Sequence, residues 1–393
     1  MTEAERSLLP SFLGYRRAGA RPGARNHLLV LNLTGLTAPS ARHVARDLRH
    51  ARLVSMPHGT AITGRGETPV TKTIESLARH PNVGAVLVLS AIRSKAEALL
   101  EQLSDDPRPA VAITLDATGR DALSFRTAAL RAGARLLSET SRQQREPFPL
   151  SDLMLALECG MSDPTSGLAA NPLLGLVADR LVAAGGAAVL GETTEWLGCE
   201  DHLAERGATP AIAKAIRQAI ARREEQARNI GMDLLGSNPN EANIAAGLST
   251  IEDKAIGSVS KSGSGPITAF LDYGERLEEP GLAAMDGPSY TPESLTGLVA
   301  AGAQIALFTS GLGNSYVSRL APTIKLTGNA ATAERLTAQF DFACSDIMDR
   351  PEQMDRTASA LLERIAEVAS GALTFGEILG EEDEVISRFG ETL

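Results

Sequence analysis

HLLVLNLTGLTAPSARHVARDLRHARLVSM, residues 27–56, decides the fold, because it has the pattern of one strand–helix–strand unit. HLLVLNL (27–33) is a short apolar run, SARHVARDLRH (40–50) has helical periodicity, and ARLVSM (51–56) is a second short run with β-branched residues. The alternation continues with strands predicted at 83–90 and 110–115 and with helices predicted at 71–80, 94–104 and 119–137. Strands that alternate with helices favour a parallel sheet with both faces covered.

A second unit follows the polar segment SRQQREPFPLS (141–151), which carries two prolines and is typical of a linker. The sequence predicts an N-terminal α/β domain over 1–140 and a C-terminal α/β domain over 152–393, both with mostly parallel sheets covered by helices. In the C-terminal domain we expect strands at 153–159, 187–192, 303–313 and 321–328, and helices at 171–186, 209–235 and 356–371. The Gly-, Ser-, Asn- and Pro-rich stretch 236–291 shows little helical pattern, and such long irregular stretches are usually functional.

The composition excludes several classes of protein. The 393 residues carry a formal net charge of −10, which does not suit binding to nucleic acid or to anionic membranes. No apolar run is long enough to span a bilayer, and the first residues do not resemble a signal peptide. The three dispersed cysteines form neither a disulfide framework nor a zinc motif. We therefore expect a cytoplasmic protein whose cores are built from Ala, Leu, Ile and Val.

Ligands of parallel sheets bind beyond the carboxyl ends of the strands, so residues that follow predicted strands are candidates for a site. GETTEWLGCEDH (191–202) places Glu192 and Glu195 directly after a predicted strand. Carboxylates with a nearby histidine suit metal ligation or acid–base catalysis. The alternative is a solvated helix start, with acids near the positive end of the helix dipole.

LECGMSDPTSGLAANP (157–172) also follows a predicted strand. Its spacing does not match the Gly-x-Ser-x-Gly nucleophile elbow. Ser162, Asp163 and Ser166 can instead cap the next helix or bind a polar ligand at its positive end. Cys159 in isolation is as well explained as a small buried apolar residue.

GSNPNEANIAAGLSTIEDKAIGSVSKSGSG (236–265) is the densest cluster of polar groups. Asn238 and Asn243 supply amides, Lys254 and Lys261 supply cations, and serines and glycines lie between them. A small polyhydroxy acid needs cations for its carboxylate and polar groups for its hydroxyls. A lysine whose pKa is lowered by burial can also remove a proton next to a carboxylate. The alternative is a polar surface loop.

Three further stretches contribute candidates. His58 lies after the second predicted strand, although a lone histidine is more often structural. FTSGLGNS (308–315) resembles an anion nest with Thr309 and Ser310, but it lacks the glycine and lysine pattern of nucleotide-binding loops. The basic segment GYRRAGARPGARN (14–26) ends at Arg25 and Asn26, where a guanidinium could bind a carboxylate or could pin a structural arm.

Taken together, the chain resembles the altronate/galactarate dehydratase family of sugar-acid hydro-lyases. Seven pieces carry the resemblance in the family's order: GYRRAGARPGARN, PHG, REPFPLSDLMLALECGMSDPTSGLAANP, GETTEWLGCEDHLAERG, GSNPNEANIAAGLSTIEDKAIGSVSKSG, DYGERLEEPGLAAMDGP and FTSGLGNS. The resemblance implies metal-assisted loss of water from a hexonate or hexarate to give a 2-keto-3-deoxy acid. It also implies a divalent metal, usually iron(II). A related branch releases sulfite from sulfolactate with a similar large subunit.

The sequence departs from the family's pattern in two respects. Family members usually carry a small N-terminal SAF-type domain, whereas this chain begins close to GYRR, so we expect that domain either as a separate small subunit or not at all. Many relatives also carry cysteines after the early strands, where this chain has Leu36, Thr60 and Arg93. Of that set of thiols only Cys159 remains, so those early loops cannot hold a metal through cysteine.

The chemistry expected is β-elimination from a small hydroxy acid. Lys254 is the leading candidate for the base or the carboxylate anchor, and His58 is the alternative base or a metal ligand. The candidate metal ligands are Cys159, Glu192 and Glu195. The candidate substrate-binding residues are Arg25, Asn26, Ser162, Asp163, Ser166, Asn238, Asn243, Lys261, Thr309 and Ser310.

Three functions remain open on the sequence alone. The first is a dehydratase acting on a sugar acid such as altronate or galactarate. The second is the large subunit of a sulfo-lyase acting on a sulfolactate-type acid. The third is a catalytically silent sugar-acid binder. For all three we expect a homo-oligomer and a small-molecule ligand.

Overall fold

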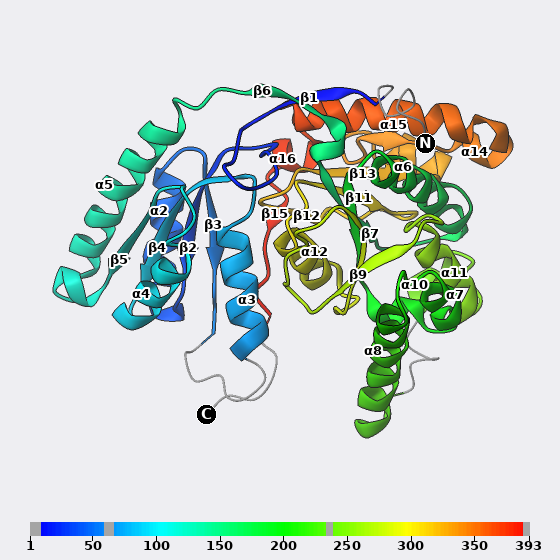
Figure 1. The fold of residues 1–393 in the computed structure, drawn as a ribbon, viewed down its shortest axis with the longest axis horizontal. Helices are drawn as coiled ribbons and strands as arrows, with labels where there is room; N and C mark the ends of the chain where they lie inside the picture. The colour runs from blue at the N-terminus through cyan, green and yellow to red at the C-terminus, as the bar shows by residue number, and fades with distance from the viewer. Residues whose placement is uncertain (1–8, 59–66, 233–238, 388–393) are drawn as a thin grey trace.

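Two parallel sheets, each with helices on both faces, form the protein (Figure 1). The computed structural model describes residues 9–58, 67–232 and 239–387. The predicted α/β class with mostly parallel sheets is confirmed. Among these residues, no helix is both long enough and apolar enough to cross a membrane.

The first sheet has the strand order β3-β2-β4-β5 and is parallel throughout. Its strands are β2 (His27–Asn32), β3 (Ala51–Ser55), β4 (Val83–Ser90) and β5 (Ala110–Thr114). Every residue of β2 and β4 is buried, as expected for strands covered on both faces. Helices α2 (Ala38–Asp47) and α5 (Ala122–Thr140) cover one face, and α3 (Glu67–Ala78) and α4 (Arg93–Gln102) cover the other.

The second sheet has the strand order β14-β13-β11-β7-β8-β10-β9 and is also parallel. Its strands are β7 (Met154–Cys159), β8 (Ala187–Leu190), β9 (Ile267–Leu271), β10 (Gly281–Met285), β11 (Ile305–Thr309), β13 (Thr323–Thr327) and β14 (Phe342–Ala343). One face packs on α6 (Asn171–Ala183), α15 (Met354–Ala369) and α11 (Ile251–Ser260). The other packs on α12 (Thr291–Ala300) and, through a shared apolar core, on the first sheet.

The strand order places a switch point at β7. The chain first adds β8, β10 and β9 on one side of β7, and then crosses to add β11, β13 and β14 on the other. In such sheets the loops on the two sides of a switch point separate and leave a crevice at the carboxyl ends of the strands. Cys159 is the last residue of β7 and lies at that end of the sheet.

The segment 141–151, predicted as a linker, forms secondary structure. Strand β6 (Glu146–Pro149) pairs antiparallel with β1 (Ser11–Gly14). The connection between the two sheets is therefore held to the N-terminal segment. The proposed domain bounds remain a prediction.

The prediction that the stretch 236–291 is irregular is wrong for about half of its described residues. Its described part contains α10 (Glu241–Ala245), α11, β9 and β10. In α11 the residues Ile251, Ala255 and Val259 recur every four positions and are buried. Gly257 and Ser258, which interrupt it, hid this apolar stripe, because tertiary packing outweighs their weak helix propensity. Thr209 caps α8 (Pro210–Asn229), because its side chain accepts a hydrogen bond from Ile212 N.

Buried polar side chains join the two sheets. The Nε2 atom of His80 donates to the Ala303 carbonyl at 3.0 Å, while its Nδ1 accepts from Asn82 N at 3.1 Å. Asn82 in turn donates to the Gln304 and Leu320 carbonyls, each at 2.9 Å. These contacts require a neutral His80 ring with its proton on Nε2.

Because these contacts need a neutral His80, we predict that the free energy of unfolding depends on pH. Burial lowers the pKa of His80 from 6.5 to about 3. His80 of the unfolded chain therefore takes up a proton as the pH falls below 6.5, whereas His80 of the folded protein stays neutral. The contribution of neutral His80 to the free energy of unfolding is therefore present above pH 6.5 and is lost as the pH falls. Between about pH 7.5 and pH 5 this costs about 2 kcal/mol of the free energy of unfolding.

Urea unfolding of wild type and of His80→Gln at both pH values measures the effect, because the glutamine variant lacks the titrating ring. The exposed His43 provides the control, and His43→Gln should keep the wild-type slope. An unchanged pH slope in His80→Gln would show that His80 does not carry the effect.

Candidate active site

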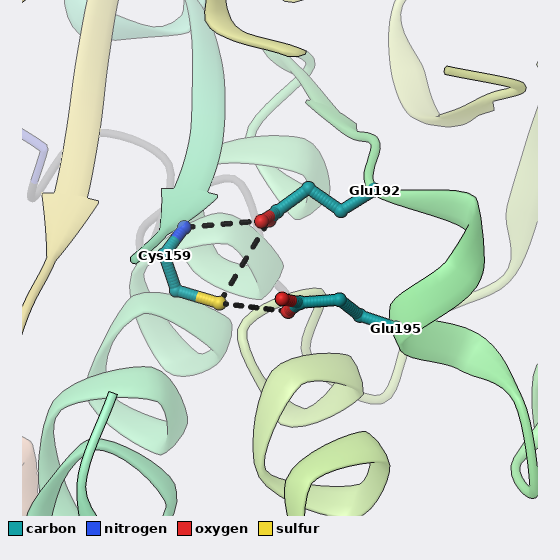
Figure 2. Close-up of side chains that lie close together, drawn as sticks. All are labelled: Cys159, Glu192 and Glu195. Atoms are coloured by element: carbon teal, nitrogen blue, oxygen red, sulfur yellow. Dashed lines mark hydrogen bonds between the residues drawn. The ribbon is translucent and has the colours of Figure 1, made fainter. Parts of the chain in front are cut away.

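Cys159, Glu192 and Glu195 lie together at the carboxyl ends of β7 and β8 (Figure 2). One possible ligand atom from each lies within 4.8 Å of the others, and all three residues are buried. The Cys159 thiol lies 3.5 Å from Glu195 Oε2 and 3.7 Å from Glu192 Oε2. The three residues assigned as metal ligands from the sequence are thus brought together.

The turn after β8 positions both glutamates. Glu192 has a φ of +68°, a left-handed conformation that costs energy for a residue with a side chain. It precedes the 3-10 turn η6 (Thr193–Trp196), which carries Glu195. The buried Trp196 indole donates to the Gly191 carbonyl at 2.9 Å and ties the turn to the strand end. A strained residue held in this way is typical of functional sites.

Helix α11 supplies the cations. Lys254, Ser258 and Lys261 are spaced by four and three positions, so they lie on one face of the helix, with Lys261 at its C-cap. Lys254 Nζ lies 2.9 Å from Glu195 Oε1. Lys261 Nζ lies 2.6 Å from Glu192 Oε2, 2.8 Å from Ser258 Oγ and 3.1 Å from Cys159 Sγ. Two buried ion pairs therefore close the cluster.

The environment shifts the pKa of every member. Burial, and then the charge of Glu195, raises the pKa of Glu192 to about 7. Burial also raises the pKa of the Glu195 carboxyl, but Lys254 and Lys261 outweigh it and hold the pKa below its ordinary value. Burial lowers the pKa of both lysines, yet the acidic neighbours more than compensate and raise it. The pKa of the Cys159 thiol is raised, chiefly by burial, so the cysteine is a neutral thiol.

Glu158 was missed in the sequence analysis. It is fully buried one residue before Cys159, and its Oε2 accepts from Ser294 Oγ at 2.8 Å, while Oε1 has no hydrogen-bond partner. Burial, and then Glu192, raises its pKa well above the ordinary value, so this carboxyl is protonated. A single acid inside the apolar run LMLALEC was the signal that could have found it.

The loop after β7 is braced by Asp163. Its Oδ1 accepts from Thr165 Oγ1 at 2.7 Å and from Ser166 N at 3.1 Å, and its Oδ2 accepts from Asn329 Nδ2 at 2.8 Å. Asn243 donates to the Ser162 carbonyl at 2.9 Å. Ser162, Asp163 and Ser166 therefore lie together at the loop that follows Cys159, and Asn243 of α10 contacts this loop and helps to hold its conformation.

Thr309 and Ser310 end the neighbouring strand. Thr309 pairs with Cys159 in the sheet register, and its hydroxyl donates to Asn171 Oδ1 at 2.5 Å. The expected anion nest is already filled by protein acceptors. The amides of Gly311 and Leu312 donate to the Met161 carbonyl, and the amide of Gly313 donates to the Ser310 hydroxyl.

The remaining candidates lie elsewhere or outside the described residues. Arg25 forms a buried ion pair with Glu377 at 2.8 Å, and with Asn26 it lines a separate cavity of about 330 Å³. His58 Nε2 lies 3.1 Å from the Ile386 carbonyl, beside a cavity of about 550 Å³. Neither cavity is lined by Cys159, Glu192 or Glu195. Asn238 lies outside the described residues. Of the three positions where many relatives carry cysteines, Thr60 also lies outside the described residues, Leu36 is exposed, and Arg93 forms an ion pair with Asp116.

Asp163 provides a test of the loop. We predict that Asp163→Ala lowers the free energy of unfolding by about 2–3 kcal/mol, because several donors lose a buried, charged acceptor. Chemical denaturation measures the change. Asp201, an exposed acid that pairs with Arg217, is the matched control, and its replacement by alanine should cost no more than about 1 kcal/mol. Equal effects of the two substitutions would contradict the bracing role.

Two family models match the chain and together span most of it. The model described as D-galactarate/altronate dehydratase, C-terminal, matches residues 150–392. The model described as D-galactarate dehydratase/altronate hydrolase, second domain, matches residues 14–141. The predicted resemblance is thus confirmed.

Curated relatives agree with these models. The chain is 31% identical to the (2R)-sulfolactate sulfo-lyase subunit beta of Chromohalobacter salexigens, over 97% of this chain and 98% of the relative. It is 30% identical to altronate dehydratase of Escherichia coli, over 96% of this chain and 78% of the relative. It is 28% identical to galactarate dehydratase (L-threo-forming) of the same organism, over 76% and 59% respectively. The chain therefore belongs to the D-galactarate/altronate dehydratase family.

Proposed function

We propose that this protein is a carbon–oxygen lyase that removes water from a sugar acid such as altronate or galactarate to give a 2-keto-3-deoxy acid. The observation that carries this proposal is the buried cluster of Cys159, Glu192, Glu195, Lys254 and Lys261 at the switch point of the second sheet. Membership in the dehydratase family supports it. The reaction breaks the C2–H bond and then the C3–O bond, and the resulting enol becomes the keto acid.

The residues of the cluster suit separate roles in this elimination. Glu192, whose pKa is about 7, suits the base that removes the C2 proton at neutral pH. The raised pKa of Lys254 favours its role as the anchor of the substrate carboxylate over a role as base. Its side chain is 11% exposed, compared with 0% for Lys261, so the acid reaches the cluster from the Lys254 side. Glu158, a neutral carboxyl, can donate a proton to the departing hydroxyl.

The cluster also has the donors for a divalent metal. A thiol and two carboxylates are ligands that iron(II) accepts, and Glu192 Oε1 is buried without a hydrogen-bond partner. Cys159, Glu192 and Glu195 would hold the ion. When bound, a divalent ion such as iron(II) stabilises negative charge that develops on the substrate carboxylate.

We further propose a small SAF-type subunit as a partner, because one relative is named as the beta subunit of a lyase. We also propose a homo-oligomer, as in the sequence analysis. A cytoplasmic location fits the three buried free cysteines, which are typical of a reducing compartment.

A second candidate is a sulfo-lyase large subunit, favoured by the 31% identity to the sulfolactate enzyme subunit. That reaction breaks a C–S bond β to a carboxylate, and the residues of the cluster would take the same roles in it as proposed for the dehydration. A silent sugar-acid binder is the third candidate. Product analysis separates the three, because they give a keto acid with water, a keto acid with sulfite, and no product.

The test is turnover of a panel of hexonates, hexarates and sulfolactate, with iron(II) and with a SAF-type small subunit added. We expect a 2-keto-3-deoxy acid from a hexonate or hexarate. Lys254→Met should lower kcat/KM by about 100-fold or more, because the substrate loses its charged anchor. The exposed Lys214 of α8 is the matched control, and Lys214→Met should retain wild-type turnover.

Two results would count against the proposal. Sulfite release from sulfolactate with no reaction of sugar acids would favour the second candidate. Wild-type activity in Lys254→Met would remove Lys254 from the site even if the reaction is a dehydration.

A further inference from the structure

Lys261 occupies the centre of the ligand set that the proposed function assigns to a metal. Its side chain is fully buried, and its ammonium contacts the thiol of Cys159, Oε2 of Glu192 and the hydroxyl of Ser258 at 2.6–3.1 Å. Two of these three partners are candidate metal ligands. An ion bound by the Cys159 thiol and Oε2 of Glu192 would compete with the ammonium for both atoms.

We propose that Lys261 is a built-in cation that competes with a divalent metal ion for Cys159 and Glu192, and thereby sets the affinity of the site for the ion. The inference rests on the ligand set of the proposed function. It goes beyond that function, because it makes one residue of this chain the determinant of metal affinity.

The charge balance supports this competition. Glu192 and Glu195 are paired one to one with Lys261 and Lys254, so these two pairs are neutral without any metal. A divalent ion would add two positive charges and the Cys159 thiol would release one proton on binding it, so the buried site would gain one net positive charge, and unbalanced buried charge is costly. Departure of the Lys261 side chain would free one oxygen of Glu192 and the thiol, and would remove a repelling charge from the vicinity of the ion.

The chain offers a matched control in Lys325. This lysine is also buried, but its ammonium donates to the carbonyl oxygens of Asn314 and Ser315, at 3.2 Å and 2.9 Å. Its replacement removes a buried ammonium of the same size without touching the ligand set. An effect common to both substitutions would therefore report loss of a buried lysine, not loss of a competitor.

The experiment is a titration of the full chain with Co²⁺, without substrate, followed by the near-ultraviolet absorption of a cobalt–thiolate bond. We expect Lys261→Met to bind Co²⁺ at least about tenfold more tightly than wild type, because a cation is removed from contact with the ligands. Lys325→Met should bind as wild type does. Adding Cys159→Ser to Lys261→Met should abolish the absorption band.

Equal or weaker Co²⁺ binding by a folded Lys261→Met would overturn the proposal. If that variant does not fold, Lys261→Gln provides the same comparison with a side chain that can still hydrogen-bond. Absence of turnover would bear on the proposed function and would leave these binding results unchanged.

Discussion

The site depends on two ion pairs buried between helix α11 and the turn after β8. Lys261 and Lys254 neutralise Glu192 and Glu195, which could not remain ionised at this depth alone. Removing one member of a buried pair typically costs about 3–5 kcal/mol, because the remaining charge loses its compensation. The pairs therefore fix the position of α11 against the sheet, and they also set the pKa values on which the proposed chemistry relies.

Glycines allow α11 to pack closely on α6 and on the turn after β7. A Cβ atom on Gly167 would lie 3.2 Å from the Cα of Gly257, where the turn after β7 meets the helix. A Cβ atom on Gly175 of α6 would lie 2.3 Å from the Ser260 carbonyl, which is closer than side-chain atoms approach. Side chains at these positions would push α11 outwards and move both lysines away from the glutamates. The two ion pairs therefore depend on glycine at these positions.

Much of the fold and part of the site could be predicted from the sequence. Strands such as 83–90 were predicted to the residue, because short apolar runs between helices have few alternatives. Cys159, Glu192, Glu195 and Lys254 follow strands or lie in a dense polar segment, and the structure brings them together. The carboxyl ends of neighbouring strands meet at one edge of a parallel sheet, so the local sequence pattern was sufficient to predict that these residues belong to one site.

The failures share a physical cause, which is that long-range partners are invisible in a local pattern. Arg25 was expected either to bind a substrate carboxylate or to pin a structural arm, and its guanidinium pairs with Glu377 of the chain itself, as the second interpretation has it. The fully buried Lys261 was expected to face substrate, whereas its ammonium faces Glu192. Helix α11 was missed because its stability comes from packing, not from its serine- and glycine-rich composition.

The central claim is that a sugar acid is bound at the Cys159–Glu192–Glu195 cluster, and a crystal structure of the protein soaked with galactarate tests it most directly. The account predicts density for the acid at the carboxyl end of β7, with a carboxylate in contact with the Lys254 ammonium. Density for galactarate in the cavity lined by Arg25 and Asn26, or in the one beside His58, with none at the cluster, would contradict it.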